Sequence, residues 1–209
     1  MRKGQLITIE GIHGAGKTTA IQHILPVLKS LGLKITYAKD QSETKIGKQI
    51  RKVNLESKTA VDPYTETFLV SAARREAFMK VIQPRLATGQ HVISERFIDA
   101  FFAFGHARSL HKKLLETLSH FTCNGTLPGL TLLLDLPPKV AQRRIKLQRP
   151  HRVEREPLGF HKLLREGYLI QARKNPGRIV VINANVPASQ VAEQIIKIIG
   201  KRLSVTTLS

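Results

Sequence analysis

The sequence predicts an α/β domain in which a parallel sheet of about five strands is covered by helices on both faces. Short runs of apolar, often β-branched residues alternate along the chain with longer segments whose apolar residues recur at helical spacing. The strand-like runs are apolar on both faces, as expected of strands buried between two layers of helices. The 209 residues show no internal repeat, low-complexity segment or long linker, so we predict a single domain over residues 1–209.

The expected elements follow one another in the order that such a fold requires. We expect strands at residues 5–10, 34–38, 91–94, 130–136 and 178–183. We expect helices at 17–31, near 46–54, at 64–88, from about 98 to 119, and at 138–147, 158–174 and 187–202. The last helix is typical, because Pro187 suits a first turn and Val191, Ile195 and Ile199 follow at core-facing intervals. Residues 148–157 break this pattern with a charged stretch that we expect to be a mobile basic loop.

The charge of the chain is its most unusual bulk property. The sequence has 34 Lys and Arg residues against 15 Asp and Glu, a formal net charge of +19. This charge favours either a nucleic-acid or membrane-surface partner, or a surface suited to polyanionic small molecules. The basic residues are scattered, with their highest density at 143–155, and no aromatic-interleaved basic strand accompanies them, so we do not favour nucleic acid.

Three further observations concern the compartment. The apolar runs are of strand length and too short to cross a bilayer. The first predicted strand begins at residue 5, which leaves no room for a leader, and Cys123 is the single cysteine, so no disulfide forms within the chain. We therefore expect a cytoplasmic protein without a membrane partner.

The first motif that carries chemistry is Gly11-Ile12-His13-Gly14-Ala15-Gly16-Lys17-Thr18-Thr19. It fits the phosphate-binding template G-x-x-x-x-G-K-[ST]. It also lies between an apolar strand and a helix, which is the context in which this template binds phosphate. The glycines let successive backbone N–H groups point inward as a nest for anions, and the helix adds its positive end. Lys17 would reach the outer phosphates of a nucleotide and the Thr18 hydroxyl would bind Mg²⁺. The sequence therefore predicts a nucleoside triphosphate site on a P-loop NTPase-type fold.

Carboxylates and arginines elsewhere suit phosphoryl transfer, which needs positioning and charge neutralisation more than covalent chemistry. Glu95 and Arg96 follow a short apolar strand, where Glu95 could hold Mg²⁺ through water and Arg96 could clamp an acceptor phosphate. Asp135, at the end of another strand, is a second candidate metal ligand. Arg74 lies among small residues on a helix that could face a ligand groove. In the basic loop, Arg149, Arg152 and Arg155 could close over a triphosphate.

Taken in order, these motifs resemble those of the thymidylate kinases over about residues 5–200. The resemblance is carried by Ile9-Glu10-Gly11, Ala72-Ala73-Arg74, Glu95-Arg96-Phe97, Arg152-Val153-Glu154 and Glu166-Gly167-Tyr168-Leu169, with Phe160 between the last two. It implies a five-stranded parallel sheet, a homodimer, and transfer of phosphate from ATP with Mg²⁺ to dTMP. It further implies that Arg96 holds the acceptor phosphate, that Glu95 replaces an aspartate of the family, that Arg74 faces the base, and that the lid at about 148–157 supplies arginines to ATP.

The chain departs from this family at the acceptor site. His13 stands where the family usually has an acid, and Lys39 begins the turn in which the family has a phosphate-binding arginine. Lys39 can supply charge but no bidentate fork. Val70 replaces a phenylalanine that stacks on thymine, and Phe101, Phe102 or Phe104 could provide another platform.

Two other functions therefore stay open. The chain could phosphorylate another deoxynucleotide or a deoxynucleoside; a nucleoside hydroxyl needs a carboxylate base, for which Asp40 is the nearby candidate. Alternatively, it could be a nucleotide-dependent binding protein that has lost acceptor chemistry.

Overall fold

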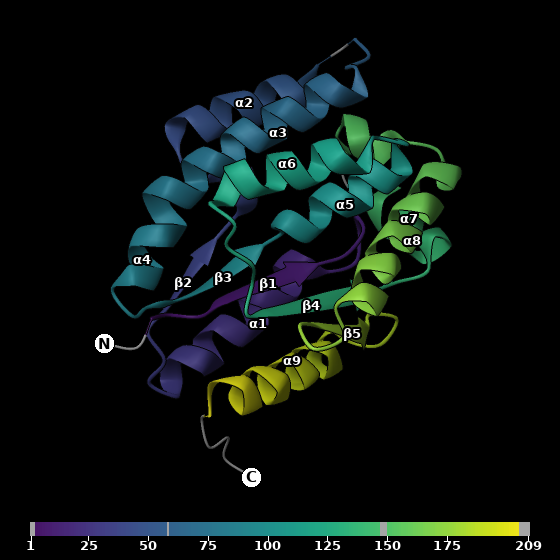
Figure 1. The fold of residues 1–209 in the computed structure, drawn as a ribbon. Coiled ribbons are helices and arrows are strands. Elements are labelled where there is room, and N and C mark those ends of the chain that lie inside the picture. The colour runs from purple at the N-terminus through teal and green to yellow at the C-terminus, as the bar shows by residue number, and fades with distance from the viewer. Residues whose placement is uncertain (1–2, 58, 147–149, 205–209) are drawn as a thin grey trace.

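The computed structural model describes residues 3–57, 59–146 and 150–204 (Figure 1). Within these residues a five-stranded, all-parallel sheet has the order β2-β3-β1-β4-β5. Its strands are β1 (Leu6–Glu10), β2 (Ile35–Ala38), β3 (His91–Glu95), β4 (Leu130–Asp135) and β5 (Ile179–Asn183). The predicted fold class and all five predicted strands are confirmed.

The position of β1 at the centre of the sheet fixes where the motifs meet. All five residues of β1 are buried, and Ile9 lies opposite Glu95 on one side and Leu132 on the other. The carboxyl ends of β1 and β3 are therefore neighbours. The phosphate loop follows β1 and Arg96 follows β3, so the register brings the two motifs to the same edge of the sheet.

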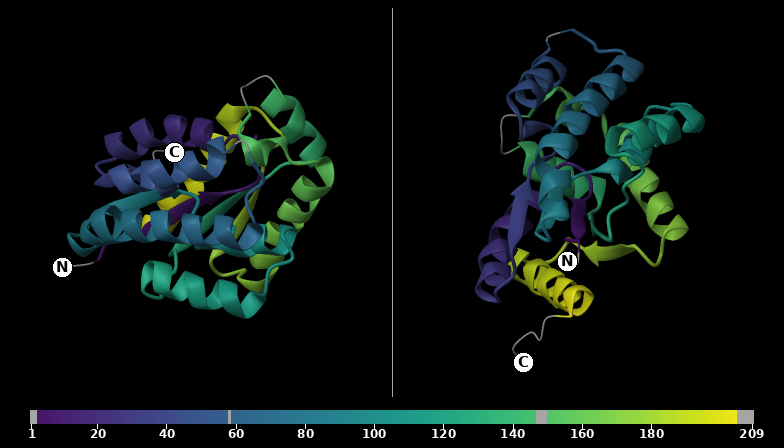
Figure 2. Two further views of the ribbon diagram at one scale, coloured as in Figure 1. Left: turned by 90° about the horizontal axis from the view of Figure 1, so that it is seen from above. Right: turned by 60° about the vertical axis from the view of Figure 1, so that its left-hand side comes forward.

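The helices cover both faces of the sheet. They are α1 (Lys17–Ser30), α2 (Lys45–Glu56), α3 (Pro63–Ala77), α4 (Gln83–Ala87), α5 (Ile98–Ala107), α6 (Lys112–Cys123), α7 (Pro138–Lys146), α8 (Leu158–Lys174) and α9 (Ala188–Leu203). Helices α1 and α9 pack together on one face, whereas α5 and α8 pack together on the other (Figures 1 and 2). The main core joins the sheet to these helices, with Ile24, Leu132, Leu164 and Ile195 fully buried.

Most predicted helices agree with the structure, but one prediction is wrong. The expected helix from about 98 to 119 is two helices, α5 and α6, which meet at a turn over residues 108–111. Ser109 in this turn has a φ of 55°, which a continuing right-handed helix does not allow. The two helices also approach closely, since a Cβ atom at Gly105 would lie 2.2 Å from Cδ1 of Leu115. No proline or glycine lies within residues 108–111, so the sequence does not mark this bend.

Two other segments are less regular than expected. The predicted helix 64–88 is one helical path, but a π-helical segment, η2 (Phe78–Ile82), separates α3 from α4. In the basic loop, the described residues 150–157 contain a short 3₁₀ helix, η3 (Arg152–Arg155), whose Val153 is buried. The mobility of this loop stays a prediction. In the described ranges, no helix has both the length and the apolar character that crossing a membrane demands.

Candidate active site

A cavity of about 510 Å³ opens at the edge of the sheet where the two motifs meet. Its walls come from the phosphate loop and α1, from the end of β3, and from α2, α3 and α5. Three residues of the basic loop, His151, Val153 and Glu154, complete the wall. The cavity therefore joins the predicted phosphate site, the predicted acceptor residues and the basic loop in one space.

The phosphate loop has the backbone that its glycines predict. Gly11, Gly14 and Gly16 have φ angles of 140°, 77° and 89°, in a region that other residues rarely adopt. At Gly14 a Cβ atom would also lie 2.7 Å from the carbonyl oxygen of Ala141, so only glycine fits. The loop thus curls tightly ahead of α1, as a phosphate nest requires.

Lys17 lies folded onto this loop. Its Nζ donates hydrogen bonds to the carbonyl oxygens of Gly11, at 3.1 Å, and Ile12, at 2.9 Å. Burial, followed by the nearby Arg96, lowers the pKa of Lys17 to about 7. A bound polyphosphate would raise this pKa again, because an adjacent anion stabilises the ammonium form.

Three oxygen-bearing side chains converge beside the loop. The Thr18 hydroxyl donates to both oxygens of Glu95, at 3.1 and 3.0 Å, and the Tyr37 hydroxyl donates to Oε2 of Glu95 at 2.8 Å. Thr18 and Glu95 line the cavity. Hydroxyl and carboxylate oxygens are the ligands that Mg²⁺ prefers, so this pair fits the predicted metal. Tyr37 was not predicted; its only signal is a hydroxyl near the end of a strand that pairs with β3.

Arg96 is held from two sides in an unusual backbone conformation. Its φ is 71°, and its Nη1 donates to the Gly11 carbonyl at 3.0 Å and to the Tyr168 hydroxyl at 2.6 Å. The Cζ atom lies 5.5 Å from the centre of the Phe104 ring. A strained backbone that aims a charged side chain into a cavity is typical of a functional position.

A buried carboxylate supports Arg96 from beneath. Tyr168 donates from its hydroxyl to Oε2 of Glu10 at 3.0 Å, and Oε1 of Glu10 accepts the Phe97 N–H at 2.6 Å. Glu10 is 1% exposed, and its burial raises the pKa to about 7, with Asp99 contributing in the same direction. Neither Glu10 nor Tyr168 was predicted as a site residue, although both lie within the motifs that carry the family resemblance.

His13 turns its ring toward the cavity. The ring meets those of Phe104 and His161 edge-on, with centroids 5.9 and 6.4 Å away. Burial, then the charges of Arg96 and Lys17, lower its pKa well below the usual range. His13 is therefore a neutral imidazole at pH 7, which offers one donor and one acceptor to a ligand.

The predicted acceptor residues also line this cavity. Arg74 is 2% exposed and its Cζ stands 4.5 Å from the centre of the Phe101 ring. Arg74, Phe101, Val70 and Lys39 all line the cavity. Of the alternative aromatic platforms, Phe104 also lines the cavity, whereas the residues around it do not include Phe102.

Of the other predicted residues, Asp135 and Arg152 are not among those that line this cavity. Asp135 accepts two hydrogen bonds from Arg165, at 2.6 and 2.7 Å, and does not line the cavity with Thr18, so its role as a metal ligand stays a prediction. Arg152 is bound by Asn54 and Glu66 rather than facing the phosphate loop. Arg149 and the side chain of Asp40 lie outside what the structure describes.

The fold and the site together define the class of this protein. A phosphate loop after the central strand of a parallel sheet, with a carboxylate and an arginine at the end of the neighbouring strand, is the arrangement of a P-loop phosphotransferase. The family model described as Thymidylate kinase matches residues 9–195. The chain therefore belongs to the thymidylate kinase family.

Curated relatives agree over nearly the whole length of the chain. A protein of Latilactobacillus sakei named Thymidylate kinase is 37% identical over 204 residues, covering 95% of each chain. One of the same name from Halalkalibacterium halodurans is 36% identical over 209 residues, covering 98% of this chain and 100% of its own. A third, from Bacillus cytotoxicus, is 34% identical over 206 residues, covering 96% and 99%.

Proposed function

We propose that this protein transfers the γ-phosphoryl group of ATP to dTMP and so produces dTDP. The observation that carries the proposal is the meeting of the phosphate loop and Arg96 in a single cavity. Membership of the thymidylate kinase family supports dTMP as the acceptor.

The site residues divide into a donor set and an acceptor set. The donor set binds the ATP phosphates through Gly11, Ile12, His13, Gly14, Ala15, Gly16, Lys17, Thr18 and Thr19. The Thr18 hydroxyl and the Glu95 carboxylate would hold Mg²⁺, which when bound neutralises charge on the phosphate oxygens. Lys17 turns from the loop carbonyls to the γ-phosphate, where its charge offsets that of the transition state.

The acceptor set orients dTMP for in-line attack. Arg96 clamps the acceptor phosphate, and its contact with Gly11 fixes that phosphate beside the donor loop. Arg74 and Phe101 face the base, Val70 packs beside it, and Lys39 adds charge at the mouth. A phosphate oxygen is already anionic, so the reaction needs no general base.

A nucleoside acceptor is less well supported. It would need a free carboxylate within reach of its hydroxyl. The described carboxylates that line the cavity are Glu66, Glu95 and Glu154, and each already accepts hydrogen bonds from protein groups. The side chain of Asp40, the candidate base, is not described, so family membership is what favours a monophosphate.

We extend the proposal to a cytoplasmic homodimer, as the family resemblance implies. Large apolar side chains are exposed along α3, α6 and the segments beside them, namely Phe68 at 49%, Met79 at 36%, Phe121 at 70% and Leu127 at 62%. Such a face suits a second copy of the chain. Light scattering of the wild type should give twice the 23.4 kDa mass of one chain. The Phe121→Asp variant should have the mass of a single chain.

A coupled assay with a panel of acceptors tests the reaction. We expect turnover with dTMP, loss of transfer in Lys17→Ala, and a higher KM for dTMP, with little change for ATP, in Arg96→Lys. Turnover with nucleosides alone would move the function to a deoxynucleoside kinase. ATP binding without turnover of any acceptor, together with salt-sensitive retention on DNA or RNA, would indicate a nucleotide-dependent binding protein.

A further inference from the structure

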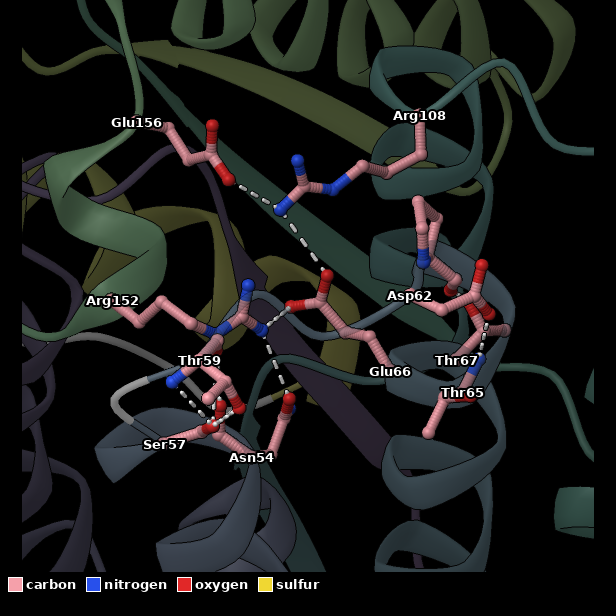
Figure 3. Close-up of polar contacts among 11 residues, drawn as sticks. Asn54, Ser57, Thr59, Asp62, Thr65, Glu66, Thr67, Arg108, Arg152 and Glu156 are labelled. Carbon is pink, nitrogen blue, oxygen red and sulfur yellow. Dashed lines mark hydrogen bonds and ion pairs between the residues drawn. The ribbon is translucent and has the colours of Figure 1, made fainter.

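Glu66, on α3, receives two guanidinium groups at the wall of the cavity (Figure 3). Its Oε1 accepts a hydrogen bond from Nη2 of Arg152 at 2.9 Å, and its Oε2 lies 3.2 Å from Nη2 of Arg108. The Glu66 side chain is only 10% exposed. A carboxylate this buried is stable in its charged form only when it is fully paired.

Each of the two arginines also binds a second group. Arg152 donates from Nε to the Asn54 carbonyl and from Nη2 to Asn54 Oδ1, both at 3.1 Å. Arg108 donates to Oε1 of Glu156 at 2.7 Å. We refer to Asn54, Glu66, Arg108, Arg152 and Glu156 as the anchor cluster.

The anchor cluster is balanced in charge and tied to four parts of the chain. Two arginines face two glutamates, and the four side chains are between 10% and 22% exposed. Asn54 comes from α2, Glu66 from α3 and Arg108 from the turn after α5, whereas Arg152 and Glu156 come from the basic loop. The cluster therefore joins the basic loop to the helices that carry the acceptor residues.

The basic loop has little regular structure of its own, so its attachments are this cluster and the buried side chain of Val153. Its described backbone–backbone hydrogen bonds are short-range ones, such as those from the N–H groups of Glu154 and Arg155 to the His151 carbonyl at 3.0 and 3.2 Å. One turn of 3₁₀ helix is not stable alone. Arg152 and Glu156 hold it at its two ends, and between them Val153 and Glu154 reach the cavity wall.

We propose that Glu66 is a positioning residue, which seats residues 150–157 against α2, α3 and α5 and thereby completes the cavity wall. In this role Arg152 is an anchor and does not itself offset charge on the triphosphate. The inference rests on the proposed function only where it concerns turnover. The seating of the loop concerns the free protein.

Hydrogen exchange and kinetics on three variants test the inference: Glu66→Gln, Arg152→Gln and the two together. Glu116→Gln is the matched control, since Glu116 pairs with Lys112 at 3.1 Å on the surface, with the two side chains 51% and 73% exposed. In the free protein we expect exchange at residues 150–157 to rise at least about fivefold in both single variants, a typical size for coupling between sites. The control should match the wild type.

The kinetics should show the same coupling. Both single variants should lose kcat/KM by similar factors, and the double variant should be no worse than the worse single one, because each change breaks the same attachment. Additive losses, with Arg152→Gln far more damaging to kcat than Glu66→Gln, would mean that Arg152 acts on the triphosphate and would overturn the inference. Unchanged exchange in Glu66→Gln would overturn it as well.

A further variant covers the case in which Glu66→Gln does not fold. Arg152→Lys keeps the charge but lacks the Nε–H that binds the Asn54 carbonyl and the rigid fork that spans Asn54 and Glu66, so exchange at residues 150–157 should still rise. Exchange equal to that of the wild type would again refute the seating role. Because exchange is measured without substrate, a wild-type protein that fails to phosphorylate dTMP would refute the proposed function alone.

Discussion

Replacing Tyr168 with Phe removes the single hydroxyl that joins Arg96 to the buried Glu10. The ring stays, so the change leaves no large void at a side chain that is 2% exposed. Two hydrogen bonds are lost, at 2.6 Å from Arg96 and at 3.0 Å to Glu10, and each involves an ionisable group. Hydrogen bonds to charged groups contribute about 1.5–3 kcal/mol each.

The loss of stability should lie at the lower end of the range that these two hydrogen bonds contribute together. Arg96 retains its bond to Gly11 and Glu10 retains the Phe97 N–H, so we expect about 3 kcal/mol rather than twice that. For a chain of this size, each kcal/mol corresponds to roughly 2–4 °C in Tm. The melting temperature should therefore fall by roughly 6–12 °C.

The functional effect should be specific to the acceptor. A less firmly held Arg96 binds the acceptor phosphate in a wider range of positions, so kcat/KM for dTMP should fall by about 10- to 100-fold, with the KM for ATP nearly unchanged. Steady-state kinetics with each substrate varied in turn measures this, and Tyr64→Phe, which removes the same group from a partly exposed position on α3, is the control. An unchanged KM and kcat for dTMP in Tyr168→Phe would refute the proposed support of Arg96.

Three further predictions concern other parts of the site and its support. Tyr37→Phe frees one oxygen of Glu95 from its 2.8 Å hydrogen bond, so the Mg²⁺ concentration for half-maximal ATP binding, measured by calorimetry, should rise about tenfold; an unchanged value would exclude this role. Glu10 has its pKa raised from 4.5 to about 7, so the folded state binds the extra proton between these values and stability should fall by up to about 3 kcal/mol as pH rises from 4.5 to 7. In Glu10→Gln, the free energy of unfolding measured with urea should fall less over this pH range. An equal fall in the variant and the wild type would show that Glu10 is not the group responsible. Asp99→Asn breaks a buried pair with Arg178, held by two bonds of 2.7 Å, and should cost about 3–5 kcal/mol in the same urea experiment, whereas a loss under 1 kcal/mol would show that the pair is dispensable.

Much of this molecule could be predicted because its signals are local. The phosphate loop combines a strand, a glycine pattern and a helix within about twenty residues, and Glu95-Arg96 follows a strand directly. The contacts that support these motifs are not local. Glu95 meets Tyr37 across 58 positions, and Glu10 meets Tyr168 across 158, so no spacing in the sequence pairs them.

The failures have the same origin. The turn after α5 contains Arg108 and Ser109, and neither proline nor glycine marks it. After the turn, α6 packs closely on Gly105, a contact that only the folded structure shows. The partners of Arg152 are equally remote in the sequence, since Asn54 and Glu66 lie 98 and 86 positions away.

The backbone at Arg96 has a consequence for anyone who engineers this chain for heat resistance. A left-handed conformation costs a residue with a side chain about 1–2 kcal/mol, and glycine would avoid that cost. Arg96→Gly would nevertheless lose the hydrogen bonds to the Gly11 carbonyl and the Tyr168 hydroxyl, which outweigh that cost. The φ of 71° at position 96 is therefore no target for stabilisation, and libraries should hold this residue constant.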